Sequence, residues 1–347
     1  MLSTSAVVML SIFCVSPADS AAEDSPRKAI ERGLSFLQTD VTTWRAEHDC
    51  ATCHHGAMSV WVLSLARQQG YALNNEATAE IAEWTTTRFF EKVDEPRAEE
   101  PGARLVSQAN IYLALSGQFV PEQDTISQSD LDRIAGHLVR HQEDDGSWSW
   151  SSAPRKNTPP PVFESDETVT LMAYLALQPR AAADADATAQ VAESRRRAAD
   201  WLEKSTSTGT TQALAFRLLV HVHAGQTGDR LQSALDALRS RQHDDGGWGQ
   251  VADANSDAYG TGQALYALSL AGVPRDNSEI QRAVEFLVAH QRDDGSWPMT
   301  SRAHPGEQPF TNPVPITYFG SAWATLGLLQ TFPATSSGAQ TVAPPDP

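Results

Sequence analysis

A motif of seven residues occurs three times in the chain and constrains its fold more than any other feature. The copies are Gln142–Trp148 (QEDDGSW), Gln242–Trp248 (QHDDGGW) and Gln291–Trp297 (QRDDGSW), and their starts lie 100 and then 49 residues apart. This spacing indicates a unit of about 50 residues, with one degenerate copy between the first two. Within each copy Asp-Asp-Gly suits a tight turn, and Trp buries a large flat surface. The chain is therefore predicted to be a repeat protein.

Helical patterns flank this Gln–Trp motif and pair into six hairpins, each with an amphipathic helix followed by a mainly apolar one. The predicted pairs are 28–37 with 57–69, 80–90 with 105–115, 131–141 with 168–177, 195–204 with 211–221, 231–241 with 261–271, and 280–290 with 318–331. The first pair carries a degenerate motif in which Gln38 and Trp44 remain but Asp-Asp-Gly is missing. In the fourth pair the motif is lost.

The alternation of the two helix types predicts an all-α fold, because a helix that is apolar on most faces is buried on most faces. We expect an α6/α6 toroid, with six buried helices inside a ring of six amphipathic ones. An open solenoid would use the same units but would need polar caps at both ends. The closed ring is preferred, with the last hairpin against the first. One continuous core means one domain, placed at residues 23–332, and a Pro/Ser/Ala-rich tail at 333–347 is expected to be disordered.

The net charge of −17 argues against nucleic acid and anionic membrane surfaces as partners, because both attract a basic face. Residues 6–15 (AVVMLSIFCV) form a short apolar run that small residues follow. This pattern predicts a signal peptide at residues 1–22, although a buried first helix is the alternative. The run is too short to span a bilayer, and no other stretch looks transmembrane. The protein is expected to be exported, to a periplasm or out of the cell.

From Phe286-Leu287 to Trp297 the chain reads as an apolar pair, three residues, Gln, a short acidic stretch and Gly-x-Trp. This order resembles the QW repeat of squalene and hopene cyclases. The broader family includes protein prenyltransferase β-subunits and complement-type thioester domains. The resemblance extends from Lys28 to Thr331 and implies a toroid whose inner helices begin around one mouth of a central cavity, where the active sites of the family lie.

The chemistry of each branch of that family is missing from the chain. Triterpene cyclases use Asp-x-Asp-Asp, and Asp184–Ala187 (DADA) lacks the fourth acid. Prenyltransferases bind zinc with Asp-x-Cys, whereas Asp49 directly precedes Cys50. Thioester proteins use Cys-Gly-Glu-Gln, and Pro305–Gln308 (PGEQ) lacks the cysteine. An aromatic content of 7% is also low for a cavity that stabilises carbocations. The resemblance therefore predicts the fold and leaves the function open.

One segment carries chemistry of its own. Cys50–His54 (CATCH) has the Cys-x-x-Cys-His pattern of covalent haem c attachment. Cys50 and Cys53 would bind the two vinyl groups, and His54 would be the ligand of the iron. Alignment of the repeats places His54 opposite Tyr259, at the mouth of the cavity. Export fits this interpretation, since such haem is attached outside the cytoplasm.

Two other interpretations of the same cysteines remain open. One is a disulfide between Cys50 and Cys53, which an oxidising compartment would favour. The other is a zinc site, in which His48 or His55 would join the two thiolates and His54.

A second axial ligand for an iron would come from a neighbouring segment. In a closed ring the loop 298–315 of the last hairpin faces the Cys50 loop, so Met299 and His304 are the leading candidates. Met172 is a further candidate, but core packing is the preferred interpretation for it.

Carboxylates gather at the predicted starts of the inner helices. Glu164, Asp166 and Asp257 are candidates for an acid/base pair at the cavity mouth of a glycoside hydrolase or lyase. Acidic residues in such positions also cap helices and interact favourably with the helix dipole, and capping is the preferred interpretation.

Three functions follow as hypotheses. The first is a haem-bearing redox protein with a redox partner. The second is a catalytic toroid that acts on an isoprenoid or a glycan, and the third is a module that binds a small apolar ligand in its cavity. The sequence leaves open whether the protein is an enzyme.

Overall fold

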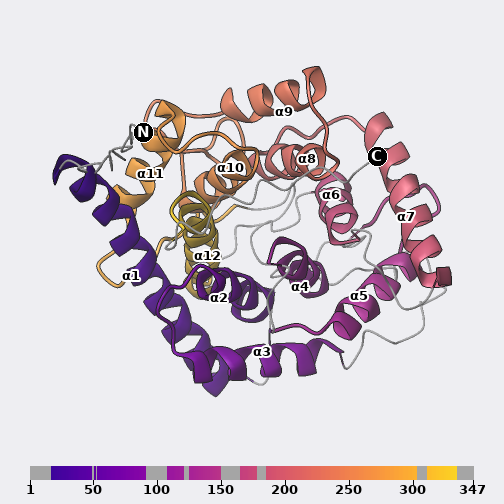
Figure 1. Ribbon diagram of the computed structural model, residues 1–347, viewed down its shortest axis with the longest axis horizontal. Coiled ribbons are helices and arrows are strands. Elements are labelled where there is room, and N and C mark those ends of the chain that lie inside the picture. Colours follow the sequence, from indigo (N-terminus) through magenta and orange to yellow (C-terminus); the bar gives the residue numbers. More distant parts are fainter. Residues whose placement is uncertain are drawn as a thin grey trace, which may run out of the picture.

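Twelve α-helices, paired into six hairpins, form two concentric rings in the described part of the chain (Figure 1). The computed structural model describes residues 17–48, 51, 53–90, 108–120, 125–149, 165–177, 185–302 and 311–333. The outer ring contains α1 (Pro17–Glu47), α3 (Asn75–Phe90), α5 (Gln128–Arg140), α7 (Ala185–Lys204), α9 (Asp229–Arg239) and α11 (Ser278–His290). The inner ring contains α2 (Ser59–Gln68), α4 (Gln108–Phe119), α6 (Asp166–Ala176), α8 (Thr211–His223), α10 (Ala258–Leu270) and α12 (Pro313–Thr331). The predicted all-α, α6/α6 toroid is confirmed.

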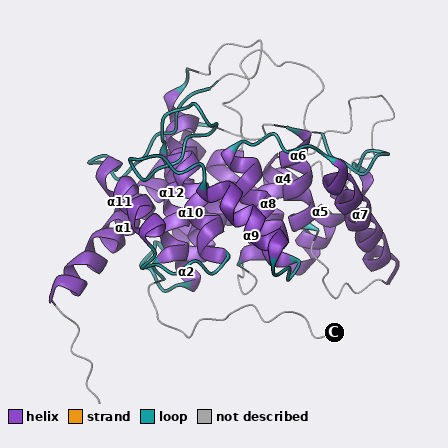
Figure 2. Ribbon diagram, turned by 90° about the horizontal axis from the view of Figure 1, so that it is seen from above, coloured by secondary structure: helices purple, strands orange, loops and turns teal. Residues whose placement is uncertain are grey.

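The two rings differ in burial as their sequences predict. All residues of α10 from Ala258 to Leu268 are buried, because neighbouring helices cover this helix on every side. In contrast, α5 buries a single stripe, formed by Leu131, Ile134, His137 and Leu138. The helices lie in one layer, with the connecting loops on its two faces (Figure 2).

The Gln–Trp motif forms the turn from an outer helix towards the next inner one. In the third copy Gly295 has a φ of 87°, a conformation that glycine adopts without strain. The Oδ1 atom of Asp294 accepts a hydrogen bond from the Ser296 N–H at 2.9 Å. Trp297 is fully buried and donates its Nε1–H to the Leu287 carbonyl at 2.7 Å, which ties the turn to the preceding outer helix. Equivalent bonds join Trp148 to Leu138 and Trp248 to Leu238.

A second set of bonds, which we call the Gln bridge, joins each motif to the next outer helix. In the third copy the Gln291 Nε2 atom donates to the carbonyl of Gly295 at 3.0 Å and to that of Ala29 in α1 at 2.9 Å. The other bridges run from Gln142 to Ser194 in α7 and from Gln242 to Glu279 in α11, both at 2.9 Å. Because α1 begins the ring and Gln291 follows its last outer helix, the third bridge closes the ring.

The inner helices complete the closure. α12 contacts α1, α2 and η1 (Cys53–Met58), the π-helical turn that leads into α2. The hydroxyl groups of Tyr318 in α12 and Ser59 in α2 are 2.6 Å apart. After α2, Tyr71 donates its hydroxyl proton to the Phe332 carbonyl at 2.8 Å. The expectation that the last hairpin lies against the first is confirmed.

The degenerate first motif does not form a turn. Helix α1 continues through Gln38 and Trp44 to Glu47, because this stretch has no Asp-Asp-Gly to end the helix. The Gln38 side chain nevertheless donates to the Asn74 carbonyl at 3.2 Å and to Thr78 Oγ1 at 3.0 Å, at the start of α3. It therefore keeps the bridging role of the motif glutamine.

Most of the predicted signal peptide (residues 1–16) and the tail (334–347) lie outside the described residues. Within the described residues, none of the helices combines the length and the apolar character that a membrane crossing requires.

Close contact between α10 and α12 gives a matched pair of predictions. A Cβ atom on Gly262 would lie 2.3 Å from the backbone carbonyl carbon of Trp323, whereas one on Gly136 in α5 would meet only the flexible end of Arg140 at 3.3 Å. We expect Gly262→Ala to lower the free energy of unfolding by about 1–3 kcal/mol through overpacking. Gly136→Ala should raise it by about 0.5–1 kcal/mol, because alanine is the better helix former. Urea denaturation of both variants measures this, and equal effects would contradict the close packing.

Candidate functional site

A cluster of rings lies where the end of α1 meets η1. Trp44 stacks on His48 with ring centroids 3.7 Å apart and on His55 with centroids 4.4 Å apart. His54 meets the Trp44 ring edge-on at 5.1 Å. Because η1 brings the chain back beside the last turns of α1, three histidines surround one tryptophan.

A chain of hydrogen bonds connects two of these histidines to a carboxylate. The Nε2 atom of His55 lies 2.7 Å from Oδ2 of Asp40, and its Nδ1 atom is hydrogen-bonded to Nδ1 of His54. An ionised carboxylate only accepts, so His55 carries its proton on Nε2 and accepts from the His54 Nδ1–H. In neutral His54 the lone pair is then on Nε2. We call this Asp40–His55–His54 chain the relay.

Burial keeps both relay imidazoles neutral. His54 is 5% exposed, and burial, followed by the proximity of His55 and His48, lowers its pKa well below the ordinary value. Burial also lowers the pKa of His55, although the hydrogen bond that His55 donates to Asp40 and the charge of that carboxylate oppose the change.

The start of α12 covers the other side of the relay. The Phe319 ring meets His54 edge-on at 5.6 Å, and the Tyr318 ring lies 4.0 Å from that of His55. Tyr259, which the repeat alignment sets opposite His54, also contacts Phe319, at 6.4 Å. The two aligned positions thus meet the same ring of α12.

The other residues of the predicted cofactor site are only partly described. Cys53 is the first residue of η1, but Cys50 and His304 lie outside the described residues, as does the side chain of Cys53. Met299 is buried, and its N–H is 3.4 Å from the Ile316 carbonyl near the start of α12. Met172 is fully buried in the core. Among the residues the structure describes, no group of three or more His, Cys, Asp or Glu is arranged to hold a metal ion.

The two candidate carboxylates that the structure describes, Asp166 and Asp257, are not brought together. Asp257 is the N-cap of α10: its Oδ1 accepts from the Gly260 N–H at 2.8 Å, and its Oδ2 accepts from Gln250 Nε2 and the Thr300 N–H, both at 2.7 Å. Burial raises the pKa of Asp257. Asp166 lies exposed in the first turn of α6, and α8 separates α6 from α10. Glu164 lies outside the described residues.

Sequence reasoning missed a cluster of buried aromatic side chains that connects the inner helices at the ring centre. Tyr259, Gln263 and Tyr266 of α10 recur at helical spacing, and the ring of Trp323 in α12 contacts both tyrosines, at 6.4 and 6.1 Å. Trp61 of α2 meets Trp323 at 5.5 Å. The connected aromatic residues are Trp61, Tyr112, Phe119, Phe216, Tyr259, Tyr266, Phe319 and Trp323. The low overall aromatic content was a poor guide, because these residues are concentrated at the centre.

Amide groups lie among these rings. Gln212 of α8 donates from Nε2 to the Tyr259 hydroxyl at 2.8 Å, but its Oε1 has no partner. Gln263 is 2% exposed, and neither of its amide atoms has a hydrogen-bond partner among the described residues. An unpaired buried amide costs about 1–3 kcal/mol, so these two glutamines are candidates to hydrogen-bond a polar atom of a ligand.

His223 at the end of α8 predicts acid sensitivity. Burial, aided by the Arg195 charge, lowers the pKa of His223 to about 4. Between that value and the unfolded pKa of about 6.5, only the unfolded chain takes up the proton, so stability falls with falling pH. The unmodified protein should lose about 3 kcal/mol of stability through His223 between pH 7 and pH 4, and we expect His223→Phe, which keeps a ring beside Phe119, to abolish that loss. Urea denaturation at the two pH values measures this, and an unchanged pH dependence would contradict it.

Comparison with known proteins agrees with this architecture. Residues 226–342 match the model of the squalene-hopene cyclase C-terminal domain. No curated protein sequence matches the chain. One similar solved structure is a variant of the type II terpene cyclase MstE from Scytonema in complex with its substrate, geranylgeranyl dihydroxybenzoate. It is 15% identical, has a TM-score of 0.57, and the match covers 91% of this chain and 100% of that one.

Glycosidase structures are similar to the same degree. A possible member of the GH105 family from Salmonella enterica serovar Paratyphi A is 14% identical with a TM-score of 0.56, and the match covers 94% of this chain and 96% of that one. A further glycosidase is 12% identical with a TM-score of 0.57, over 87% and 98% of the two chains. The chain thus has the α/α toroid fold of these proteins, and identities this low show the fold alone.

Proposed function

We propose that this toroid is an exported redox protein that carries a covalently bound haem c. Cys50 and Cys53 would form the two thioether bonds, and Nε2 of His54 would be an axial ligand of the iron. The observation that carries the proposal is the relay, which puts the lone pair of a buried, neutral His54 on Nε2. Histidines that bind metals almost always donate their other N–H to a neighbouring acceptor, as His54 does.

Of the three residues that would hold the haem, His54 is the one whose side chain is described, and its imidazole has the chemistry of an axial ligand. Bound haem would supply one-electron chemistry at its iron. The chain itself would hold His54 in one tautomer and orientation through the relay, and Trp44 and Phe319 would shield the imidazole from water. Met299, buried near the start of α12, remains our candidate for a second axial ligand, together with His304.

Pyridine haemochrome spectroscopy combined with metal analysis tests the proposal on protein exported from a host with complete haem-attachment machinery. We expect one covalently bound haem per chain. A colourless protein with stoichiometric zinc would replace haem by the zinc alternative. A colourless, metal-free protein without free thiols would indicate the Cys50–Cys53 disulfide.

A second candidate function follows from the ring centre, where aromatic rings surround unpaired amides. We propose that the centre binds a small apolar ligand with one polar group. The substrate in the MstE structure, geranylgeranyl dihydroxybenzoate, has this character, which supports the proposal by analogy.

Substitution of Gln263 tests the second candidate. We expect Gln263→Leu to raise the free energy of unfolding by about 1–3 kcal/mol, because it removes an unpaired buried amide. The same variant should weaken binding of geranylgeraniol, measured by quenching of tryptophan fluorescence. Gln281→Leu, on the exposed face of α11, is the matched control and should change neither property. If Gln263→Leu binds geranylgeraniol as tightly as the unmodified protein, the Gln263 amide does not contact the ligand, and the proposal is contradicted.

A further inference from the structure

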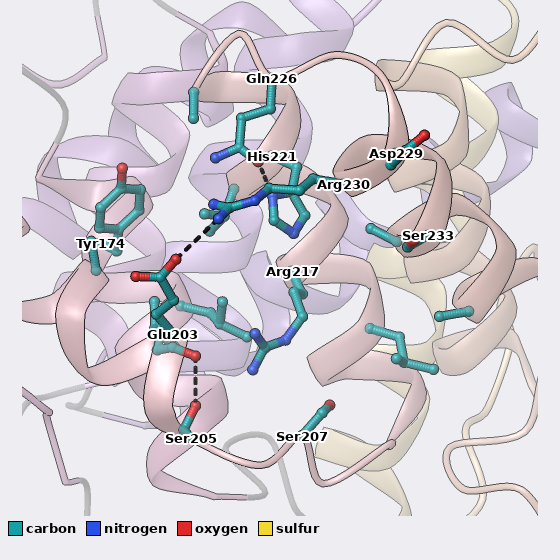
Figure 3. A pocket seen from close by; sticks show the side chains of 18 of the residues that line it. Tyr174, Glu203, Ser205, Ser207, Arg217, His221, Gln226, Asp229, Arg230 and Ser233 are labelled. Carbon is teal, nitrogen blue, oxygen red and sulfur yellow. Dashed lines mark hydrogen bonds and ion pairs between the residues drawn. The ribbon is translucent and has the colours of Figure 1, made fainter.

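A cavity of about 680 Å³ opens on the flank of the toroid, away from the relay. It lies between the outer helices α7 and α9, and its floor is formed by α6 and α8 (Figure 3). The apolar part of its lining comes from small and branched side chains, including those of Leu171, Leu214, Val220 and Ala234. Its volume is in the range of small-molecule sites.

The cavity lies at a joint that lacks the Gln bridge. Bridges from Gln142 and Gln242 join α5 to α7 and α9 to α11, but the hairpin of α7 and α8 has lost the motif. A direct bond across the α7–α9 joint is the ion pair of Arg230 and Glu203, at 3.2 Å, with side chains 68% and 67% exposed. Such an exposed pair contributes little. The cavity therefore lies between two outer helices that no Gln bridge joins.

Polar groups surround the apolar floor of this cavity. The Nε and Nη2 atoms of Arg217 donate to Oε1 of the buried Glu167 at 3.1 and 2.5 Å, and Nη1 is uncommitted among the described residues. His221 donates from Nδ1 to Gln226 Oε1 at 2.6 Å, so its Nε2 is an acceptor in the neutral ring. Burial is the main cause that lowers the pKa of His221. Figure 3 shows the side chains of Arg217, His221 and Gln226 around one space.

Two more groups complete the set. The side-chain Nε2 atom of Gln226 and the hydroxyl of Ser233 make no hydrogen bond to a described residue. The cavity thus offers two donors (Arg217 Nη1 and Gln226 Nε2), an acceptor (His221 Nε2) and a hydroxyl group that can do both.

The charges around the cavity select against an anion. Glu167 neutralises Arg217 from below, and Glu203 neutralises Arg230. Asp229 adds a carboxylate to the lining without an opposing cation among the described residues. A phosphate or carboxylate ligand would meet this negative excess, whereas an uncharged ligand would not.

We propose that the flank cavity binds a neutral sugar unit, either free or at the end of a glycan. Sugar hydroxyls both donate and accept hydrogen bonds, which matches the donors and acceptors around the cavity. The C–H faces of a sugar ring can pack on its apolar floor. This site is separate from the haem proposal, because none of its lining residues belongs to α1, η1, α2 or α12.

Isothermal calorimetry with maltose, cellobiose and N-acetylglucosamine tests the proposal on the full chain, with inorganic phosphate as the anionic comparison. We expect at least one of the neutral sugars to bind and phosphate not to bind. Ala237→Trp fills the cavity and should abolish binding, whereas Gln232→Trp, exposed on the same helix, should leave the affinity unchanged.

A second, smaller substitution tests the proposal even if the Ala237→Trp variant does not fold. Gln226→Leu removes one donor and the acceptor of the His221 proton, and it should weaken sugar binding roughly threefold to tenfold. Absence of binding by all three sugars would overturn the proposal, as would binding of phosphate alone or full affinity in a folded Ala237→Trp variant. The haem content of every variant should match that of the unmodified protein, so failure here is distinguishable from failure of the haem proposal.

Discussion

The His54→Ala variant is expected to carry almost no covalently bound haem after export, whereas His48→Ala should carry as much as the unmodified protein. His54 directly follows the second thiol of the motif, and the relay puts its lone pair on Nε2, the atom that would bind the iron. His48 stacks on Trp44 and interacts through Nδ1 with the Trp44 carbonyl, at 3.2 Å. It therefore supports the ring cluster without belonging to the relay. The absorbance of haem that stays bound to the denatured protein gives the number of haems per chain in each variant.

Asp40 supplies the control for this experiment. Asp40→Asn keeps the size of the side chain but removes the charge at the outer end of the relay, so haem should remain attached while its reduction potential rises. Full haem attachment in the His54→Ala variant would contradict the proposed role of His54. An unchanged potential in Asp40→Asn would show that the relay does not act on the iron ligand.

Trp297→Ala is expected to have the largest effect on stability, lowering the free energy of unfolding by about 3–5 kcal/mol. The indole is fully buried and bonded to the Leu287 carbonyl, and a Cβ atom on Gly33 of α1 would lie 2.8 Å from it. Its loss would leave a cavity at the contact that closes the ring. Trp201→Ala on α7 is the control, since that indole is only partly buried and bonds to Asp145 at 3.1 Å. Equal losses in guanidinium denaturation would contradict a special role for the closing motif.

The sequence was sufficient for the ring because its signals are local and repeated. Burial on every face distinguishes the inner helices from the outer ones, and Asp-Asp-Gly marks the turns. In the third copy, Asp-Asp-Gly puts a glycine at position 295, where the turn has a positive φ. The order of helices then leaves few arrangements that bury all six apolar members.

The relay was harder to predict because it depends on a missing turn. Asp40, Trp44 and His48 lie four residues apart, and they share one face only because α1 continues to Glu47. When residues 38–44 are interpreted as a degenerate turn, the four-residue spacing of these three side chains does not predict a shared helix face. Asp40 and His55 are 15 residues apart in sequence and meet only because η1 folds back beside α1. No sequence pattern carried that contact.

Closure by the third Gln bridge means that the folded protein has no natural beginning. The joint between α11 and α1 is made of the same bonds as the joints within the chain. The ring itself therefore does not depend on which helix comes first in the sequence. A circularly permuted gene that began at α9 would rebuild the same ring once the old ends were linked. Its new ends would lie in the α8–α9 loop, beside the α7–α9 joint, where no Gln bridge would be broken. We therefore expect this loop to tolerate new termini best.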